Sequence, residues 1–161
     1  MKQITKILVA NRGEIALRIM RSCKEMEIAT VAVFSEADRN APFVRYADEA
    51  ICIGPPASTQ SYLNGKKIIE VCKRLKVDAI HPGYGFLSEN AAFAREVVEN
   101  GIIFIGPSAE SMEMMGDKLS AKETAKKYNI PMVPGTDGAV KNIEEAKKVA
   151  KEEGDRIVAG A

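Results

Sequence analysis

The sequence lacks any imbalance of charge. Lys and Arg number 23 against 22 Asp and Glu, which leaves a net charge of +1, and the basic residues are scattered along the chain. Proteins that bind nucleic acid concentrate positive charge on one face or one helix. This composition therefore argues against a nucleic-acid partner.

Residues that bind metals or form disulfides are also scarce. His81 is the only histidine, so no zinc cluster built around several histidines is possible, and we expect no metal site in this chain. Cys23, Cys52 and Cys72 are odd in number, far apart and surrounded by apolar residues. This pattern favours buried, reduced thiols over disulfides, which predicts a cytoplasmic protein.

Long hydrophobic runs and a dinucleotide-binding motif are absent as well. The apolar stretch 28–34 has the length of a strand, far below the roughly 20 residues of a membrane helix, and the N-terminus shows no signal-peptide pattern. We therefore predict no membrane partner. Neither Asn11-Arg12-Gly13 nor Gly83-Tyr84-Gly85 continues into Gly-x-Gly-x-x-Gly, which argues against a dehydrogenase.

Short apolar runs alternate with segments in which apolar residues have helical spacing. Strands are expected at Lys6–Ala10, Thr30–Ser35, Ala50–Ile53, Ala79–His81 and Ile102–Ile105, and helices at Glu14–Met26, Leu63–Lys76 and Ala91–Glu99. This order predicts an α/β fold with a doubly wound parallel sheet covered by helices on both faces. Loops that follow the carboxyl ends of such strands meet at one rim, so we expect 11–13 and 81–85 to lie together.

The ten residues 81–90 carry the strongest local signal. Pro82 cannot donate to a sheet, and Gly83 and Gly85 allow backbone conformations and close approaches that other residues resist. The chain must therefore leave the sheet in a glycine-rich loop, which is suited to a ligand. Ser88 or Asn90 can cap the next helix, whose expected core positions are Phe93, Ala94, Val97 and Val98.

The first helix has an apolar stripe and a charged stripe. The expected core stripe consists of Ile15, Ile19, Cys23 and Met26. Glu14, Arg18, Arg21 and Glu25 form the charged stripe. From spacing alone, the charged stripe fits a solvated helix face.

The C-terminal third is predicted to be mainly helical. Ser108 can cap a helix through Met115, and Asp117 can cap a second one that reaches about Tyr128. Residues 129–135 contain two prolines and should be extended. Asn142 and Glu145 resemble a capping box for a last helix that ends near residue 154.

Three segments together resemble the biotin carboxylase family. They are Ala10–Ala16 (ANRGEIA), 81–90 (HPGYGFLSEN) and Met115–Lys118 (MGDK), and the likeness runs from about residue 4 to about residue 150. The resemblance implies a Rossmann-like, pre-ATP-grasp domain at 1–112 and a helical linker at 113–134, which together make an α/β core with a C-terminal helical extension. Residues 135–161 would be an incomplete start of the ATP-grasp region.

The resemblance also implies site residues. Lys118 would contact ATP phosphate, and Gly83, Tyr84 and Gly85 would line the biotin and bicarbonate site. Arg18, Arg21 and Glu25 match positions at the homodimer interface of the family. It implies no catalytic residue and no metal ligand in this chain.

The parent activity implied is that of an ATP-dependent ligase. Such an enzyme uses ATP, Mg²⁺ and bicarbonate to carboxylate biotin on a carrier protein, and acetyl-CoA, propionyl-CoA and pyruvate carboxylases all share this first domain. Residues 155–161 depart from the family pattern, because Gly160 stands where an ATP-binding lysine is expected. We therefore expect an inactive fragment. Two alternatives stay open at this stage: another ATP-grasp ligase similar to carbamoyl-phosphate synthetase, and a non-catalytic binding or assembly module.

Overall fold

The computed structural model describes residues 3–116, 118–131, 143–144, 147–148 and 150–151. Contacts divide the chain into two units, Met1–Met112 and Glu113–Ala161. The first unit contains the whole sheet and all of the site residues discussed below except Lys118.

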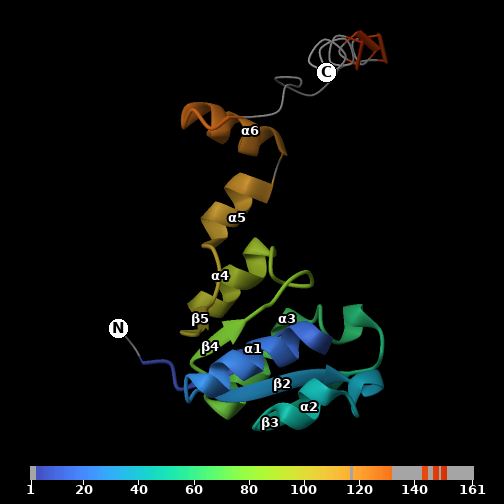
Figure 1. Cartoon of the computed structure of the whole chain (residues 1–161), viewed down its shortest axis with the longest axis vertical. Helices are drawn as coiled ribbons and strands as arrows, with labels where there is room; N and C mark the ends of the chain where they lie inside the picture. The colour runs from blue at the N-terminus through green and yellow to red at the C-terminus, as the bar shows by residue number, and fades with distance from the viewer. Residues whose placement is uncertain (1–2, 117, 132–142, 145–146, 149, 152–161) are drawn as a thin grey trace. The chain divides into compact units, whose positions relative to one another are not determined.

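A parallel sheet of five strands forms the centre of the first unit (Figure 1). The strands are β1 (Lys6–Val9), β2 (Ala29–Ser35), β3 (Glu49–Gly54), β4 (Ala79–His81) and β5 (Ile103–Phe104). Their order is β3-β2-β1-β4-β5. The predicted doubly wound α/β fold is confirmed. The expected bounds agree fully for β4 and differ by no more than one residue at either end of the other strands.

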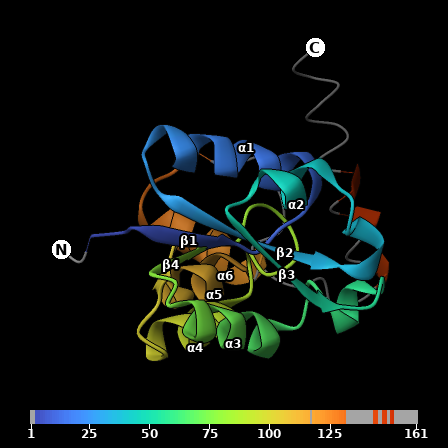
Figure 2. The same cartoon turned by 90° about the horizontal axis from the view of Figure 1, so that it is seen from below.

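Helices cover both faces of this sheet (Figure 2). On one face lie α1 (Gly13–Glu25) and α2 (Pro42–Tyr46), and on the other lie α3 (Gly65–Leu75) and α4 (Ala91–Glu99). Alternate residues of each strand point to opposite faces, so Leu8 packs in the α3/α4 core whereas Ile7 and Val9 pack in the α1/α2 core. Each short strand is therefore buried between two apolar cores.

Sequence periodicity misassigned parts of two helices. In α1 the buried residues are Ala16, Met20 and Cys23, so the predicted core stripe is right for Cys23. It is wrong for Met26, which is 68% exposed, and Ile15 and Ile19 are only half-buried. Similarly, Val98 in α4 is 62% exposed. Both errors have one cause: a helix on a sheet buries a narrow stripe, and apolar residues at its margin face outward.

Local caps set several helix ends. Asn64 accepts a hydrogen bond from the Lys67 amide (3.1 Å), so α3 starts two residues later than predicted. Of the two candidates for α4, Asn90 is the cap, because its Oδ1 accepts from the Phe93 amide at 2.9 Å. The short helix α2 and the 3-10 helices Glu36–Asp38 and Ser58–Gln60 were not predicted.

Two further helices follow β5, namely α5 (Ala109–Gly116) and α6 (Lys118–Lys127). The predicted Ser108 cap is confirmed, since its Oγ accepts from the Ser111 amide at 3.2 Å. Asn129 is not extended as predicted: its φ is +53°, and the Ile130 amide donates to the Ala125 carbonyl, which terminates α6. The predictions for Asp117, for residues 132–135 and for the Asn142–Glu145 capping box lie outside the described residues.

Candidate functional site

The candidate site lies where the strand order of the sheet reverses. From β1 the chain proceeds outward through β2 and β3, and it then returns to the other side of β1 with β4 and β5. Open α/β sheets bind ligands outside the carboxyl ends of the strands at such a switch point. The turn after β1 and the loop after β4 both occupy this position, so the predicted shared rim is confirmed.

The Asn11 side chain joins these two segments. Its Nδ2 donates to the Pro82 carbonyl (2.7 Å) and to the Tyr84 carbonyl (2.8 Å), and its Oδ1 accepts from the Arg12 amide (2.9 Å). The residue is only 2% exposed. A buried amide with all three polar positions used stabilises the contact between the segments.

The glycine loop, residues 82–86, has an unusual backbone. Gly83, Gly85 and Phe86 have φ values of +67°, +64° and +45°. A Cβ on Gly83 would meet Asn11 Nδ2 at 2.6 Å, whereas a Cβ on Gly85 would have nothing within 4 Å. Gly83 is thus required by both conformation and close packing, and Gly85 by conformation alone.

An aromatic contact holds the far end of the loop. Phe86 is a non-glycine residue in the left-handed region, a conformation that persists only when its surroundings impose it. Its ring stacks on Tyr62 with centroids 5.2 Å apart. The next residue, Leu87, is buried in the core. The loop is therefore held at both ends, by Asn11 and by Tyr62.

Tyr62 belongs to an ionic cluster on the same edge, which we call the Asp38 cluster: Arg12, Ser35, Asp38 and Tyr62. Asp38 accepts from Arg12 Nε (2.8 Å) and Nη2 (2.6 Å), from the Tyr62 hydroxyl (2.6 Å) and from Ser35 Oγ (3.4 Å). The Tyr62 hydroxyl in turn accepts from the Ser35 amide at 3.1 Å. Sequence reasoning missed this cluster. The available signal was an acidic residue three positions after the end of the buried strand β2.

The contacts within the cluster shift the pKa values of its members in opposite directions. Hydrogen bonds from Arg12 hold the pKa of Asp38 below its usual value despite partial burial, and Asp38 raises the pKa of Arg12. Burial, together with the hydrogen bond to Asp38, raises the pKa of Tyr62. At neutral pH the cluster thus holds an ionised carboxylate, a guanidinium and a neutral phenol.

An open hollow of about 490 Å³ lies between the β1 turn and the glycine loop. Its lining residues include Asn11, Arg12 and Gly13 from the β1 turn and Tyr84, Gly85 and Phe86 from the glycine loop. Tyr84 is 75% exposed, so its ring is presented to solvent. Of the three predicted site residues, Tyr84 and Gly85 line this hollow, whereas Gly83 is not among its lining residues and packs against Asn11.

The only histidine of the chain supports the loop from the strand side. His81 Nδ1 accepts a hydrogen bond from the Gly83 amide (3.1 Å), so the neutral ring carries its proton on Nε2. Burial lowers the pKa of His81, which favours this neutral form. His81 thus supports the backbone of the glycine loop.

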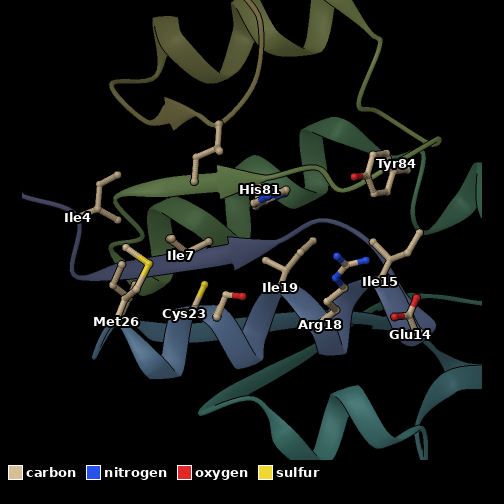
Figure 3. A pocket seen from close by; sticks show the side chains of 13 residues that line it. Ile4, Ile7, Glu14, Ile15, Arg18, Ile19, Cys23, Met26, His81 and Tyr84 are labelled. Atoms are coloured by element: carbon tan, nitrogen blue, oxygen red, sulfur yellow. The ribbon is translucent and has the colours of Figure 1, made fainter.

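A second hollow, here called the α1 groove, runs between α1 and β4 and has a volume of about 400 Å³ (Figure 3). Ile4 and Met26 lie at one end, and Tyr84 and Glu14 at the other. Ile15 and Ile19, predicted in the core, are half-buried and line this groove. Arg18 is exposed at its rim, and Arg21 and Glu25 are exposed elsewhere on α1.

The remaining predicted groups are described only in part. Lys118 is the first residue of α6, and its side chain lies outside the described part of the chain. Among the described residues, no group of three or more His, Cys, Asp or Glu is arranged to hold a metal ion. Cys23 and Cys72 are buried free thiols, whereas Cys52 is half-buried, which corrects its predicted burial. None of the helices in the described ranges has the length and apolar character needed to cross a membrane.

The fold and the rim define a class, a doubly wound α/β domain that presents two loops at its switch point. The family model described as "Biotin carboxylase, N-terminal domain" matches residues 3–112. The chain belongs to the biotin carboxylase family and contains its N-terminal domain. This assignment decides against the alternative of a ligase family similar to carbamoyl-phosphate synthetase.

Individual relatives agree with the family. Over 155 residues the chain is 54% identical to biotin carboxylase 1 of Bacillus subtilis (strain 168), covering 96% of this chain and 34% of the relative. It is 50% identical over 153 residues to the mitochondrial propionyl-CoA carboxylase alpha chain of Homo sapiens, covering 95% of this chain and 21% of that protein. The chain thus spans at most about a third of the length of these relatives.

A solved structure shows the same fold. It is the biotin carboxylase domain dimer of the Hydrogenobacter thermophilus 2-oxoglutarate carboxylase in complex with MgADP, ADP and bicarbonate. The TM-score is 0.86 at 49% sequence identity, and the match covers 94% of this chain and 33% of that one.

Proposed function

We propose that this chain is the N-terminal part of a biotin carboxylase, a ligase that uses ATP and bicarbonate to carboxylate biotin on a carrier protein. The observation that carries the proposal is the glycine loop, because its matched sequence adopts a constrained backbone beside an accessible hollow at the switch point. We place the protein in the cytoplasm, in keeping with its three free cysteines.

In this proposal Gly83, Tyr84 and Gly85 line the side of the site that receives biotin and bicarbonate. The residues present fit such a ligand: Gly85 leaves the backbone uncovered, and the Tyr84 ring offers an exposed apolar face with a hydroxyl at its tip. Biotin supplies a ureido nitrogen as the acceptor of the carboxyl group. The loop would contribute orientation and the exclusion of water on one side of that nitrogen.

ATP binding is assigned to Lys118 and to later parts of the enzyme. An ammonium group suits a phosphate oxygen, since it is a compact charge with three donors. Magnesium would neutralise the phosphates, and we place its ligands in the later part of the enzyme, as the family resemblance implies. The domain division at 112 and 134 and the incomplete ATP-grasp start at 135–161 are part of the same proposal.

Homodimer formation is assigned to the exposed charges of α1. Arg18, Arg21 and Glu25 are all exposed, and Arg18 borders the apolar α1 groove, so a partner surface could cover charge and apolar area together. The Hydrogenobacter relative is described as a dimer.

The test uses the intact enzyme that contains this chain. Tyr84→Ala should lower kcat/KM for biotin about tenfold or more and leave the KM for ATP unchanged, whereas Lys118→Gln should do the reverse. The lysine contact to phosphate is worth roughly 1.5–3 kcal/mol. If each variant changed kcat/KM for biotin and the KM for ATP to the same extent, the assignment of separate ligand sites would be wrong.

The 161-residue chain alone should show no bicarbonate-dependent cleavage of ATP. The proposed ligands of magnesium and most of those of ATP belong to the rest of the enzyme. Turnover by the isolated chain, measured as phosphate release with and without bicarbonate, would contradict the division of roles proposed here.

A further inference from the structure

Asn11 differs from the other buried polar residues because its side chain binds the backbone of the glycine loop. The backbone ladder between β1 and β4 ends with the Ala10 amide, which donates to the His81 carbonyl at 2.9 Å. Beyond this point Pro82 has no amide hydrogen, so the backbone cannot continue the pairing. The Asn11 side chain takes over, with one nitrogen donating to the carbonyls on both sides of Gly83.

Only an amide of this length meets the geometry. Both Nδ2 protons go to the loop carbonyls, while Oδ1 is fixed by the Arg12 amide, so the two ends of the amide are not interchangeable. A carboxylate in the same place would set an oxygen against two carbonyl oxygens at donor distance. Gly83 closes around the amide, since a Cβ there would meet Asn11 Cγ at 2.9 Å.

The geometry assigns Asn11 as the positioning residue of the biotin-facing loop. Both amide protons of Asn11 are used by loop carbonyls, so Asn11 acts on the site through the loop. It fixes the Tyr84 carbonyl, and thereby the direction in which the Tyr84 ring and the uncovered face of Gly85 are presented. This inference rests on the function proposed above for the loop, and the experiment below separates the two.

The first measurement is amide hydrogen exchange on the 161-residue chain, resolved by NMR. In Asn11→Asp the hydrogen-bonded amides of Gly83 and Ser88 should exchange at least about tenfold faster than in the wild type, because two neutral hydrogen bonds that hold the loop are replaced by repulsion between oxygen atoms. Asn11→Ser, which keeps a single short donor, serves if the aspartate variant does not fold, and it should show a smaller acceleration in the same amides.

The matched control is Thr30→Val. Thr30 is also buried and lies at the amino end of β2, away from the glycine loop. Its hydroxyl donates to the Asp48 carboxylate at 2.8 Å and accepts from the Asp48 amide at 3.2 Å. At an equal fall in the melting temperature, this variant should leave exchange at the Gly83 and Ser88 amides within about twofold of the wild type. If both variants accelerated these amides alike, or if Asn11→Asp left them unchanged, Asn11 would be an ordinary stabilising residue and the inference would be overturned.

The second measurement is steady-state kinetics of the intact enzyme. Asn11→Asp should lower kcat/KM for biotin about tenfold while the KM for ATP stays within about twofold; Thr30→Val should change neither. If Tyr84→Ala also left the biotin step unchanged, the proposed function of the loop would fail, and the exchange data would still decide the role of Asn11. If Tyr84→Ala slowed the step and Asn11→Asp did not, the positioning role would be overturned.

Discussion

Two polar clusters at the carboxyl edge of the sheet hold neighbouring segments by different means. The Asn11 amide is neutral, and its partners are backbone atoms on both sides of Gly83. The Asp38 carboxylate is ionised, and its partners are the side chains of Arg12, Tyr62 and Ser35. The hydrogen bonds of Asn11 involve no titratable group, whereas the second cluster couples the stability of the edge to the charge of one carboxylate.

The clusters are joined through Tyr62. Its hydroxyl donates to Asp38, and its ring stacks on Phe86 at the end of the glycine loop. A change in the ionic cluster can therefore reach the loop through one aromatic ring. The following predictions test how separate the two clusters are, from the largest expected effect to the smallest.

The two glycines of the loop should differ sharply when replaced by alanine. Gly83→Ala meets both a positive φ and the Asn11 side chain, so we expect a loss of about 3 kcal/mol in the free energy of unfolding. Gly85→Ala has the positive φ but open space, so the loss should be about 1 kcal/mol. Urea unfolding of both variants decides the matter, and equal losses would show that Asn11 does not close the loop around Gly83.

Removing the charge of Asp38 should lower the free energy of unfolding by less than inserting a methyl group against Asn11 in Gly83→Ala. Asp38→Asn keeps the shape but weakens bonds to Arg12 and Tyr62, which should lower the free energy of unfolding by roughly 2 kcal/mol, since Arg12 is half exposed and partly screened. The matched control is Asp48→Asn, an exposed carboxylate that bonds the Thr30 amide and hydroxyl, with an expected loss of about 1 kcal/mol. A larger loss at Asp48 in urea unfolding would contradict this ranking.

The loss of stability at acid pH should depend strongly on the Asp38 cluster. The pKa of Asp38 is lowered in the folded chain, so its contribution is present above the ordinary value of 3.8 and is lost as the pH falls through the folded pKa. Asp38→Asn should therefore flatten the curve of unfolding free energy against pH below about pH 4. Asn11→Ser should shift that curve downward without changing its slope. An unchanged slope in Asp38→Asn would mean that other carboxylates dominate acid unfolding.

His81 adds a weaker dependence near neutral pH. Its pKa is lowered by burial from 6.5, so the unfolded chain takes up the proton first, and stability falls as the pH drops below 6.5. Protonation also removes the acceptor for the Gly83 amide, and Glu14, Arg18 and Tyr84 line the same groove. His81→Asn keeps an acceptor without titrating, and should remove this part of the pH dependence between pH 8 and pH 5.5. A curve that kept its shape in that variant would assign the effect to another group.

Reversal of the α1 arginines should have the smallest effect on folding. Arg18→Glu with Arg21→Glu should change the free energy of unfolding of this chain by no more than about 0.5 kcal/mol, since both side chains are exposed. In the intact enzyme the same change should weaken the dimer in sedimentation equilibrium, and Lys24→Glu on the same helix is the matched control. An unchanged dimer dissociation constant would leave these arginines as a solvated face.

Local sequence was sufficient for the sheet and for the existence of the loop. Strands that are buried between two cores appear in the sequence as continuous apolar runs. Pro82 and the two glycines after it end β4 through local backbone chemistry, whatever the tertiary contacts are. Sequence was weaker for the helix margins, because spacing does not say how wide a stripe the sheet will cover, as Met26 and Val98 show. It was silent on α2 and the 3-10 helices, which are too short to have a period.

Tertiary structure alone decided the partners within the site. Asn11 lies 71 positions before Pro82, and Asp38 lies 24 before Tyr62, so no local pattern could pair them. Parallel strands bring such residues together because each strand returns to the same edge through a covering helix. The sequence thus determined that a glycine loop leaves the sheet after β4, through the missing amide of proline and the freedom of glycine. The fold determined which amide holds the loop, since only the adjacency of β1 and β4 places Asn11 beneath it.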